Sequence, residues 1–322
     1  FRHDESNPLP HDMVVVDELS MVSMTMMARL VAALKPGARL VAVGDPDQLS
    51  SVEAGAVCAD LTGASRLGRS VVRLTHNFRF GSGIEALATA IRCGDADAAL
   101  ALLADGTGGV RLIDSRDSDT VLRARCVDAG RRLFDAAQSG DSAAALDALD
   151  NHRLLCAHRR GPYGVQWWTR TVTGWLGEDV PGFATDTEFH VGRPVLMTRN
   201  ATDLGLFNGD TGVVLAGDPS AVVFATGVGP QRFSPYQVDG LTSVYAMTVH
   251  KSQGSQFRRV SLVLPLADSP LLSRELLYTA VTRASDDVVI VGTAEAVRAA
   301  ITRRSARTSG LADRLEVGQE GS

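Results

Sequence analysis

Several features common in other protein classes are scarce or missing in this 322-residue sequence. It has no apolar run of about 18 residues, the length that spans a membrane, and its N-terminus lacks the basic and apolar regions of a secretory signal. Lysine occurs only at positions 35 and 251, so 30 of the 32 basic residues are arginine. Neither lysine lies in a Gly-x-x-x-x-Gly-Lys-Ser/Thr phosphate loop, because Lys35 precedes Pro-Gly and Lys251 follows Val-His. We therefore expect a cytoplasmic protein without membrane contact and without a phosphate loop in this stretch.

Cysteine and net charge are also low. The four cysteines form no Cys-x-x-Cys pair, which argues against a zinc, iron–sulfur or redox motif and predicts buried, reduced thiols. They are Cys58, Cys93, Cys126 and Cys156. A formal net charge of -5 provides no overall attraction for nucleic acid, so such a partner would have to be bound by local basic patches.

Two short apolar runs near the N-terminus each end in acidic residues. They are residues 13–18 (Met-Val-Val-Val-Asp-Glu) and residues 40–45 (Leu-Val-Ala-Val-Gly-Asp). Because both are unalternating and rich in valine, each predicts a strand buried on both faces of a parallel sheet. Between them, Ser23 is a candidate helix N-cap and Lys35-Pro36-Gly37 a stop signal, so we predict a strand–helix–strand unit. Carboxylates at the carboxyl ends of such strands are typical of enzymes that hold Mg²⁺ and hydrolyse nucleotides.

The middle of the chain predicts further buried strands and a mostly helical, alanine-rich layer over residues 95–151. The expected strands cover residues 70–74, 110–113 and 153–157, and helices are expected up to Leu61 and over residues 83–92. A glycine-rich turn at residues 159–164 leads into a helix that carries Trp167 and Trp168. These tryptophans are candidates for base stacking, although packing in the core or at a domain boundary is the interpretation we favour.

The sequence pattern changes over residues 190–238, where short runs of β-forming residues alternate with turn signals such as Asn208-Gly209. This spacing predicts a small antiparallel barrel inserted in the α/β domain. The parallel sheet is expected to resume over residues 244–249, 260–264 and 288–291. The arginine- and serine-rich end after Arg303 predicts a loosely held tail.

Three later stretches, taken together with Asp17 and Glu18, indicate phosphoryl-transfer chemistry, which none of them indicates alone. One is the strand and donor-rich loop at residues 246–256, the second is Leu-Tyr-Thr-Ala-Val-Thr-Arg at residues 277–283, and the third is Asn77-Phe78-Arg79. Arginines aimed across a cleft at Asp17 and Glu18 would stabilise the charge of a phosphoryl group in transfer.

In this order, the motifs resemble those of superfamily 1 helicases, and specifically the RecD-type subunit of exodeoxyribonuclease V (RecBCD). The matching stretches cover nearly the whole chain: Asp17-Glu18-Leu-Ser-Met21, Gly44-Asp45-x-x-Gln48-Leu, Ser51-Val-Glu-Ala-Gly-Ala56, Asn77-Phe-Arg79, Gly192-Arg-Pro194, Leu206-Phe-Asn-Gly-Asp210, Thr248-Val-His-Lys-Ser-Gln-Gly254 and Tyr278-Thr-Ala-Val-Thr-Arg-Ala284.

The resemblance implies a fold of two RecA-like parallel sheets with a small SH3-like barrel in the second. The expected domains are residues 1–74 (the C-terminal part of the first RecA-like domain), 75–189 with 239–305 (the second), 190–238 (the barrel) and 306–322 (a tail). It also implies ATP and Mg²⁺ as cofactors, single-stranded DNA and DNA ends as substrates, RecB-like and RecC-like partners, and 5′ to 3′ movement in double-strand break repair.

The resemblance also implies a role for each matching residue. Asp17 would hold Mg²⁺ through its water shell, Glu18 would orient the attacking water, and Gln48 would sense the γ-phosphate. The arginine fingers would be Arg79 and Arg283. The nucleotide cleft would be lined by Gln253, Gly254 and Gln256, while Thr248, His250 and Ser252 would face the DNA.

This sequence departs from the family pattern at two positions, where Leu19 replaces an alanine and Gln256 replaces a glutamate. The larger departure is the phosphate loop, which the resemblance places upstream of Phe1. We therefore expect the isolated chain to be the C-terminal portion of a helicase, with no DNA-dependent ATPase activity alone.

Two alternatives remain open. One is a stand-alone RecD-like or relaxase-linked helicase, although Ser51-Val-Glu-Ala-Gly-Ala56 and the tail at Ser309-Gly310-Leu311 favour a subunit of a complex. The other is a non-catalytic remnant that binds a partner or DNA.

Overall fold

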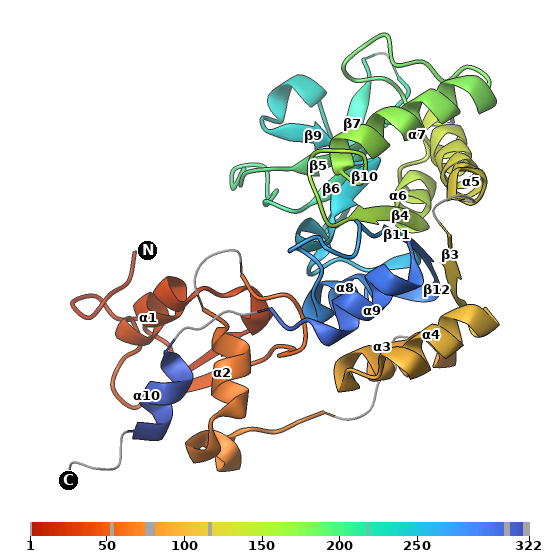
Figure 1. Cartoon of the computed structure of the whole chain (residues 1–322). Coiled ribbons are helices and arrows are strands. Elements are labelled where there is room, and N and C mark those ends of the chain that lie inside the picture. Colours follow the sequence, from red (N-terminus) through yellow and green to blue (C-terminus); the bar gives the residue numbers. More distant parts are fainter. Residues whose placement is uncertain are drawn as a thin grey trace.

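A computed structural model describes residues 2–51, 55–74, 81–114, 118–217, 219–305 and 310–317. A smaller part built from the N-terminal residues lies beside a larger part, and a connecting segment leads from one to the other (Figure 1). The smaller part contains β1 (Met13–Val16), α1 (Met24–Ala32), β2 (Arg39–Ala42) and α2 (Val57–Gly63). Helix α10 (Leu311–Val317), close to the C-terminus, packs against α2.

The strand–helix–strand unit predicted from the two acidic-edged runs is confirmed. Strands β1 and β2 pair in parallel, and the Ser23 hydroxyl accepts a hydrogen bond from the Met26 amide at 3.3 Å, as an N-cap does. Burial of these strands on both faces is wrong, because Met13 and Val15 are 51% and 60% exposed. Alternate residues of β1 are exposed since, among the described residues, the sheet has only two strands and a core on one face.

The strand expected at residues 70–74 is also wrong. A 3-10 helix, η2 (Ser65–Ser70), occupies its start, and Val72 and Leu74 after it are 83% and 89% exposed. A strand needs a neighbouring edge with which to form hydrogen bonds. These residues instead run away from β1 and β2 toward the larger part (Figure 1), so the apolar run has no sheet to join.

The larger part is built on a five-stranded parallel sheet in the order β10-β4-β11-β12-β3. Its strands are β3 (Val110–Ile113), β4 (His152–Cys156), β10 (Ala246–Thr248), β11 (Phe257–Val263) and β12 (Ala284–Val291). Each pairs in parallel with its neighbour. The five strands predicted here from buried apolar runs are therefore confirmed.

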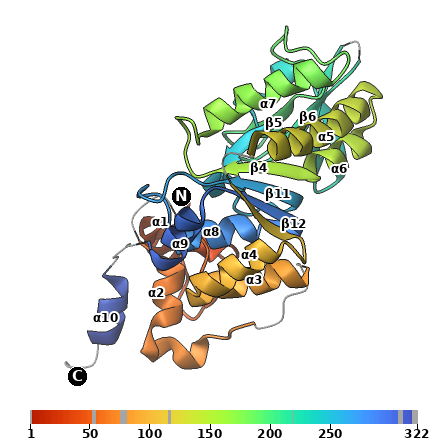
Figure 2. The same ribbon diagram turned by 45° about the vertical axis from the view of Figure 1, so that its right-hand side comes forward.

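Helices cover both faces of this sheet, as Figures 1 and 2 show. Val288 and Ile290 of β12 pack with one set of helices, and Val289 and Val291 pack with the other. The first set is α3 (Ser82–Cys93), α4 (Ala96–Asp105), α8 (Arg274–Val281) and α9 (Ala294–Thr302). The second set is α5 (Ser118–Gln138) and α7 (Val165–Asp179). Burial on both faces explains why β4, β11 and β12 each end in four consecutive buried residues.

A second five-stranded sheet, antiparallel and in the order β8-β7-β6-β5-β9, follows α7. Its strands are β5 (Pro194–Met197), β6 (Thr211–Leu215), β7 (Ala221–Thr226), β8 (Gly229–Phe233) and β9 (Leu241–Ser243). Gly209, at φ +104, lies in the connection between β5 and β6, where the hairpin was predicted. No described residues pair β8 with β9, so the expected closed barrel is not confirmed. Helix α6 (Ser142–Asp150) packs on this sheet.

The chain end after Arg303 differs from the loosely held tail that the sequence predicted. The described part of it contains α10, and the Arg66 guanidinium donates a hydrogen bond to the Leu315 carbonyl at 3.5 Å. Across the described chain, no helix is both long and apolar enough to cross a membrane. All four cysteines are free, and three are buried, but Cys93 is exposed, contrary to the prediction.

Candidate functional site

Glu18, the expected catalytic base, has an unusual backbone conformation directly after β1. At φ 52° and ψ 44° it is the one non-glycine residue with positive φ in the described chain. Its amide donates to the Asp17 carboxylate at 2.8 Å, and the following Leu19 amide donates to the Val43 carbonyl at 2.9 Å. Such conformations cost energy and concentrate at functional sites. The turn therefore fixes both carboxylates at the carboxyl end of the strand.

Leu19, one of the two departures from the family pattern, points into the core. It is 3% exposed and packs with Met27, Val57 and Cys58. A Cβ atom on Gly44 would lie 2.9 Å from the Leu19 Cβ, which explains the glycine two positions after β2. The larger side chain thus fills the N-terminal core and does not crowd the exposed Asp17.

The loop after β2 holds the Gln48 side chain by its amide nitrogen, while its amide oxygen has no partner in the described chain. Gln48 Nε2 donates to Asp45 Oδ2 at 3.1 Å, and the Asp47 amide donates to Asp45 Oδ1 at 3.0 Å. Gln48 Oε1 is buried and accepts no hydrogen bond from the described residues. A buried polar atom without a partner is costly, and in a native structure it often marks a binding site.

Leu49 joins the two parts of the molecule. Its side chain is 4% exposed and packs in the core of the five-stranded parallel sheet. Its amide donates to Thr279 Oγ1 at 2.8 Å, and its carbonyl accepts from Gln253 Nε2 at 2.6 Å. The loop that carries Gln48 is therefore held against α8 and against the turn after β10. We call the contact of Leu49 with Thr279 and Gln253 the Leu49 latch.

Arg283, the expected arginine finger, is 6% exposed and lies just after α8. Its Nε donates to the Thr279 carbonyl at 3.2 Å, and its Nη1 donates to the Ser255 carbonyl at 3.1 Å. Thr279 thus contacts both Arg283 and Leu49, which connects the arginine to the Gln48 loop. The other expected finger, Arg79, lies outside the described residues together with Asn77 and Phe78.

Acidic and aromatic groups of the two parts also meet near this loop. Burial, and then the nearby Asp45 carboxylate, raise the pKa of the Asp47 carboxyl. Burial, followed by the Asp45 charge, raises the pKa of the Tyr278 hydroxyl well above its usual range. Sequence reasoning missed Asp47, Leu49 and the role of Thr279. The one sequence feature that could have indicated the role of Leu49 is its position as an apolar residue directly after the polar run Asp45-Pro-Asp-Gln.

The turn after β10 contains the residues expected to face DNA and nucleotide. Thr248 Oγ1 accepts from the Lys251 amide at 3.3 Å and so caps η4 (Val249–Ser252), in which His250 is half-buried. Ser252 is fully buried, and its hydroxyl donates to the Val249 carbonyl at 2.8 Å. In contrast with the expectation, Ser252 therefore has its hydroxyl engaged inside the protein.

The two residues expected to line the nucleotide cleft beyond this turn are both exposed. Gly254 has φ +76, and a Cβ there would meet nothing within 4 Å. Glycine is thus required by the backbone conformation, not by a close approach of other atoms. Gln256 precedes the buried Phe257 at the start of β11.

The described residues contain no group of three or more His, Cys, Asp or Glu side chains placed to bind a metal ion. This is compatible with Mg²⁺, which keeps several waters and is held through one or two carboxylates together with substrate phosphates. The exposed Asp17 carboxylate is a donor of that kind.

Comparison with known proteins agrees with this geometry. Residues 3–115 match the AAA domain family, and residues 243–291 match the UvrD-like helicase C-terminal domain family. The computed structure is similar to the crystal structure of the Bacteroides Pif1 helicase in complex with ADP-AlF3 and single-stranded DNA. The TM-score is 0.50 at 17% identity, over 90% of this chain and 73% of that one, so the two share a fold.

Sequence relatives cover more of the chain at higher identity. The RecBCD enzyme subunit RecD of Mycobacterium tuberculosis is 50% identical over 319 residues, which are 98% of this chain and 55% of the relative. The ATP-dependent RecD2 DNA helicase of Deinococcus radiodurans is 30% identical over 98% of this chain and 41% of its own length. The chain therefore spans about half the length of the curated relatives it matches.

Proposed function

Over 98% of its length this chain matches the RecD-type proteins of helicase superfamily 1, and on that premise we propose that it forms part of an ATP-dependent DNA helicase. The observation that carries the proposal is the Leu49 latch. It brings the Gln48 loop against α8, just after which Arg283 lies, and Gln48 Oε1 is left without a partner in the described chain. Elements that follow two different sheets thus converge, as a nucleotide cleft between two RecA-like domains requires.

In this proposal the chain's own residues divide the work on ATP. Asp17 holds the position where Mg²⁺ would bind through water, and the ion would supply charge neutralisation on the phosphates. Glu18 orients the attacking water, and its fixed backbone keeps the carboxylate at the strand end. Gln48 accepts a hydrogen bond through Oε1, while Arg283 stabilises the charge that develops on the transferred group.

The same proposal includes the DNA, the partners and the cellular role. Thr248 and His250 lie at one edge of the parallel sheet, where they would meet the phosphates of a single strand moving 5′ to 3′. The likeness to the RecD subunit of RecBCD supports RecB-like and RecC-like partners and a cytoplasmic role in double-strand break repair.

A stand-alone helicase is the second candidate, because the chain is also 30% identical to the RecD2 helicase over the same 98% of its length. The two candidates share the ATP site and differ in whether partner subunits are needed. Co-purification of the intact protein with RecB-like and RecC-like subunits would favour the first, and unwinding by the protein alone would favour the second.

The ATP site is tested by replacing Arg283 in an intact enzyme that joins this chain to a phosphate-loop segment. We expect Arg283→Ala to lower DNA-stimulated ATP turnover by about 10³-fold or more, as removal of an arginine finger does, with little change in DNA affinity. The matched control is Arg298→Ala, which removes a surface arginine paired with Asp97 at 2.6 Å and should leave turnover unchanged. Near-normal turnover in Arg283→Ala would remove Arg283 from the site.

A further inference from the structure

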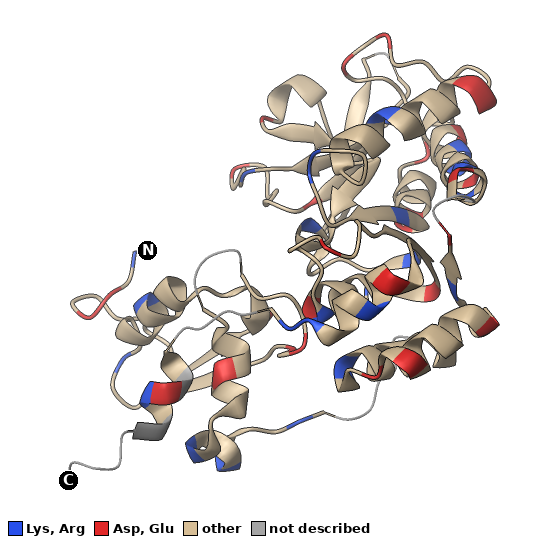
Figure 3. Ribbon diagram, in the orientation of Figure 1, with Lys and Arg blue, Asp and Glu red and all other residues tan. Residues whose placement is uncertain are grey.

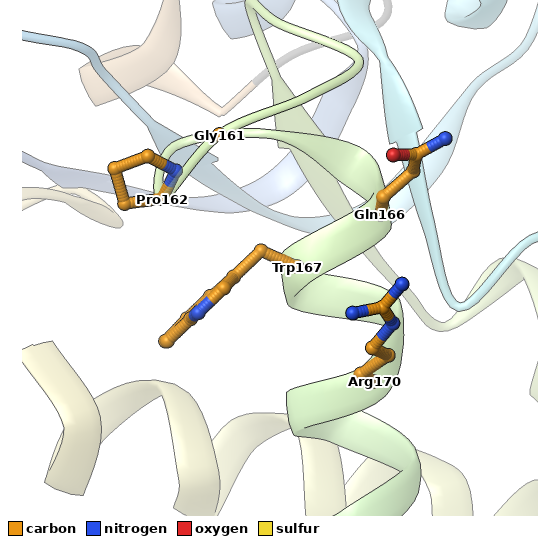
Figure 4. A pocket seen from close by; sticks show the side chains of 5 residues that line it. All are labelled: Gly161, Pro162, Gln166, Trp167 and Arg170. Atoms are coloured by element: carbon orange, nitrogen blue, oxygen red, sulfur yellow. The ribbon is translucent and has the colours of Figure 1, made fainter.

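An open pocket lies where α7 begins, and none of the residues assigned to ATP lines it. It has a volume of about 310 Å³ and is lined by Gly161, Pro162, Gln166, Trp167 and Arg170. Trp167 is 43% exposed, whereas its neighbour Trp168 is 4% exposed and packs in the core. Packing in the core is therefore confirmed for Trp168, whereas Trp167 keeps an exposed face. Figure 4 shows the Trp167 indole projecting from α7, with one ring face turned toward Pro162 across a gap.

The local backbone holds this arrangement in place. The Val165 amide donates to the His158 carbonyl at 3.0 Å, and the Gln166 amide donates to the Arg159 carbonyl at 3.1 Å, so the turn is tied to the first residues of α7. A Cβ on Gly164 would lie 2.4 Å from the Arg160 carbonyl oxygen, which shows how tight the turn is. The Trp167 ring also packs edge-on against the buried Trp168, with centroids 4.7 Å apart. A ligand would meet a largely preformed surface.

Exposed arginines lie in the pocket and in the turn that precedes it. Arg159, Arg160 and Arg170 are exposed, and none of them belongs to an ion pair recorded for the described residues. The acidic residues of α7, Glu178 and Asp179, lie at the far end of that helix, which is red in Figure 3. Both of them pair with Arg123. An aromatic face beside unpaired arginines suits a ligand that combines a planar ring with phosphate.

The pocket lies next to the turn expected to face DNA. Strands β4 and β10 are neighbours, with Cys156 opposite Thr248, so the loops that follow them leave the same edge of the sheet. Burial and then the charge of Arg159 lower the pKa of the Lys251 ammonium, which places these two cations near each other. Single-stranded DNA that contacts Thr248 and His250 would therefore lie next to the loop that carries Arg159.

We propose that a base of single-stranded DNA stacks on Trp167, on the face turned toward Pro162, while Arg159 and Arg170 contact neighbouring phosphates. This stacking site rests on the proposed DNA-binding function and adds a contact that the helicase motifs do not include. Aromatic stacking tolerates any base, because every base has a π face, so the site suits a protein that moves along DNA regardless of sequence.

The test measures binding of a twelve-nucleotide oligothymidylate to the full chain and to two Trp167 variants. We expect Trp167→Ala to weaken binding about tenfold to a hundredfold, the range for loss of one stacked base. Trp167→Phe should bind within about threefold of wild type, because phenylalanine retains a ring.

Fluorescence gives a second measurement, since all three tryptophans lie in α7. Oligothymidylate should quench the fluorescence of the wild-type chain, and most of that quenching should vanish in Trp167→Phe. The control Trp175→Phe should keep both the affinity and the quenching.

An abasic strand with the same number of phosphates separates stacking from charge. Trp167→Ala and wild type should bind this strand equally, whereas Arg170→Ala should weaken binding of both strands. If wild type binds oligothymidylate and Trp167→Ala binds it equally well, the stacking site is wrong and the DNA-binding function stands. If the wild-type chain binds neither strand at low salt, both the stacking site and the proposed DNA contact fail. If Trp167→Ala weakens binding of the oligothymidylate and of the abasic strand by the same factor, Trp167 has a packing role and the stacking site is wrong.

Discussion

At the scale of single residues, Glu18 shows how a functional position can oppose stability. A non-glycine residue in the left-handed conformation costs about 1–2 kcal/mol, and asparagine adopts it more readily than glutamate. Glu18 is held there by the bonds on either side, from its own amide to Asp17 and from the Leu19 amide to Val43. The position therefore has a carboxylate where the backbone alone would favour asparagine or glycine.

We predict that Glu18→Asn raises the free energy of unfolding by about 0.5–1 kcal/mol relative to Glu18→Gln, which keeps the size and backbone preference of glutamate. Urea unfolding of the two variants measures the difference. Neither variant has the carboxylate, so both should lack ATP turnover in an intact enzyme. An asparagine variant no more stable than the glutamine variant would show that the conformation stores no strain.

A second residue, His152, makes stability depend on pH. Burial, reinforced by the charges of Arg125, Arg259 and Arg153, lowers the pKa of His152 well below its ordinary value of 6.5. The ring nitrogen Nε2 lies 2.9 Å from the Ser261 hydroxyl. Below pH 6.5 the unfolded chain binds a proton that the folded chain excludes, so acid favours unfolding.

We therefore predict that the free energy of unfolding falls as the pH decreases from about 6.5 to 5, by up to about 1.4 kcal/mol per pH unit for this proton. His152→Gln retains a hydrogen-bonding group but does not titrate, so the variant should lose this part of the slope. A remainder should persist, because burial also lowers the pKa of His190. Urea titrations at several pH values measure the slope, and an unchanged slope in the variant would exclude His152 as its source.

At the scale of elements, the sequence predicts strands correctly where helices cover both faces of a sheet. The strands of the parallel sheet were recognisable from their apolar residues. In β12, for example, Val288 to Val291 pack alternately on one helical layer and on the other. The same pattern misled at residues 70–74, where Val72 and Leu74 form an exposed connection. An apolar run shows that burial is favourable, but it does not show whether a sheet edge is within reach.

The elements of the site were predictable to a similar degree. Strand ends locate Asp17, Glu18 and the loop with Gln48, and the N-cap and stop signals around α1 were read correctly. What the sequence could not show is which backbone groups pair across the molecule. Leu49 bonds to residues more than 200 positions away, and no local pattern encodes such a contact.

At the scale of the whole molecule, the Leu49 latch is the contact in which one loop of the smaller part enters the core of the larger part. The chain segment that leads out of the smaller part, around Val72, is exposed. Thr279 is fully buried and supplies the acceptor for the Leu49 amide. Its removal would leave that buried N–H without a partner, which costs about 1–3 kcal/mol.

We predict that Thr279→Val makes the two parts unfold separately. The matched control is Thr282→Val, since within the described chain the Thr282 hydroxyl donates to the Tyr278 and Thr279 carbonyls of its own helix. All three tryptophans lie in α7, so their fluorescence follows the larger part, whereas circular dichroism follows the whole chain. In wild type and Thr282→Val the two signals should change at the same urea concentration, because the latch couples the parts. In Thr279→Val the circular dichroism transition should begin at lower urea. Coincident transitions in Thr279→Val would show that the latch does not hold the parts together, and the convergence of Gln48 and Arg283 would then need another cause.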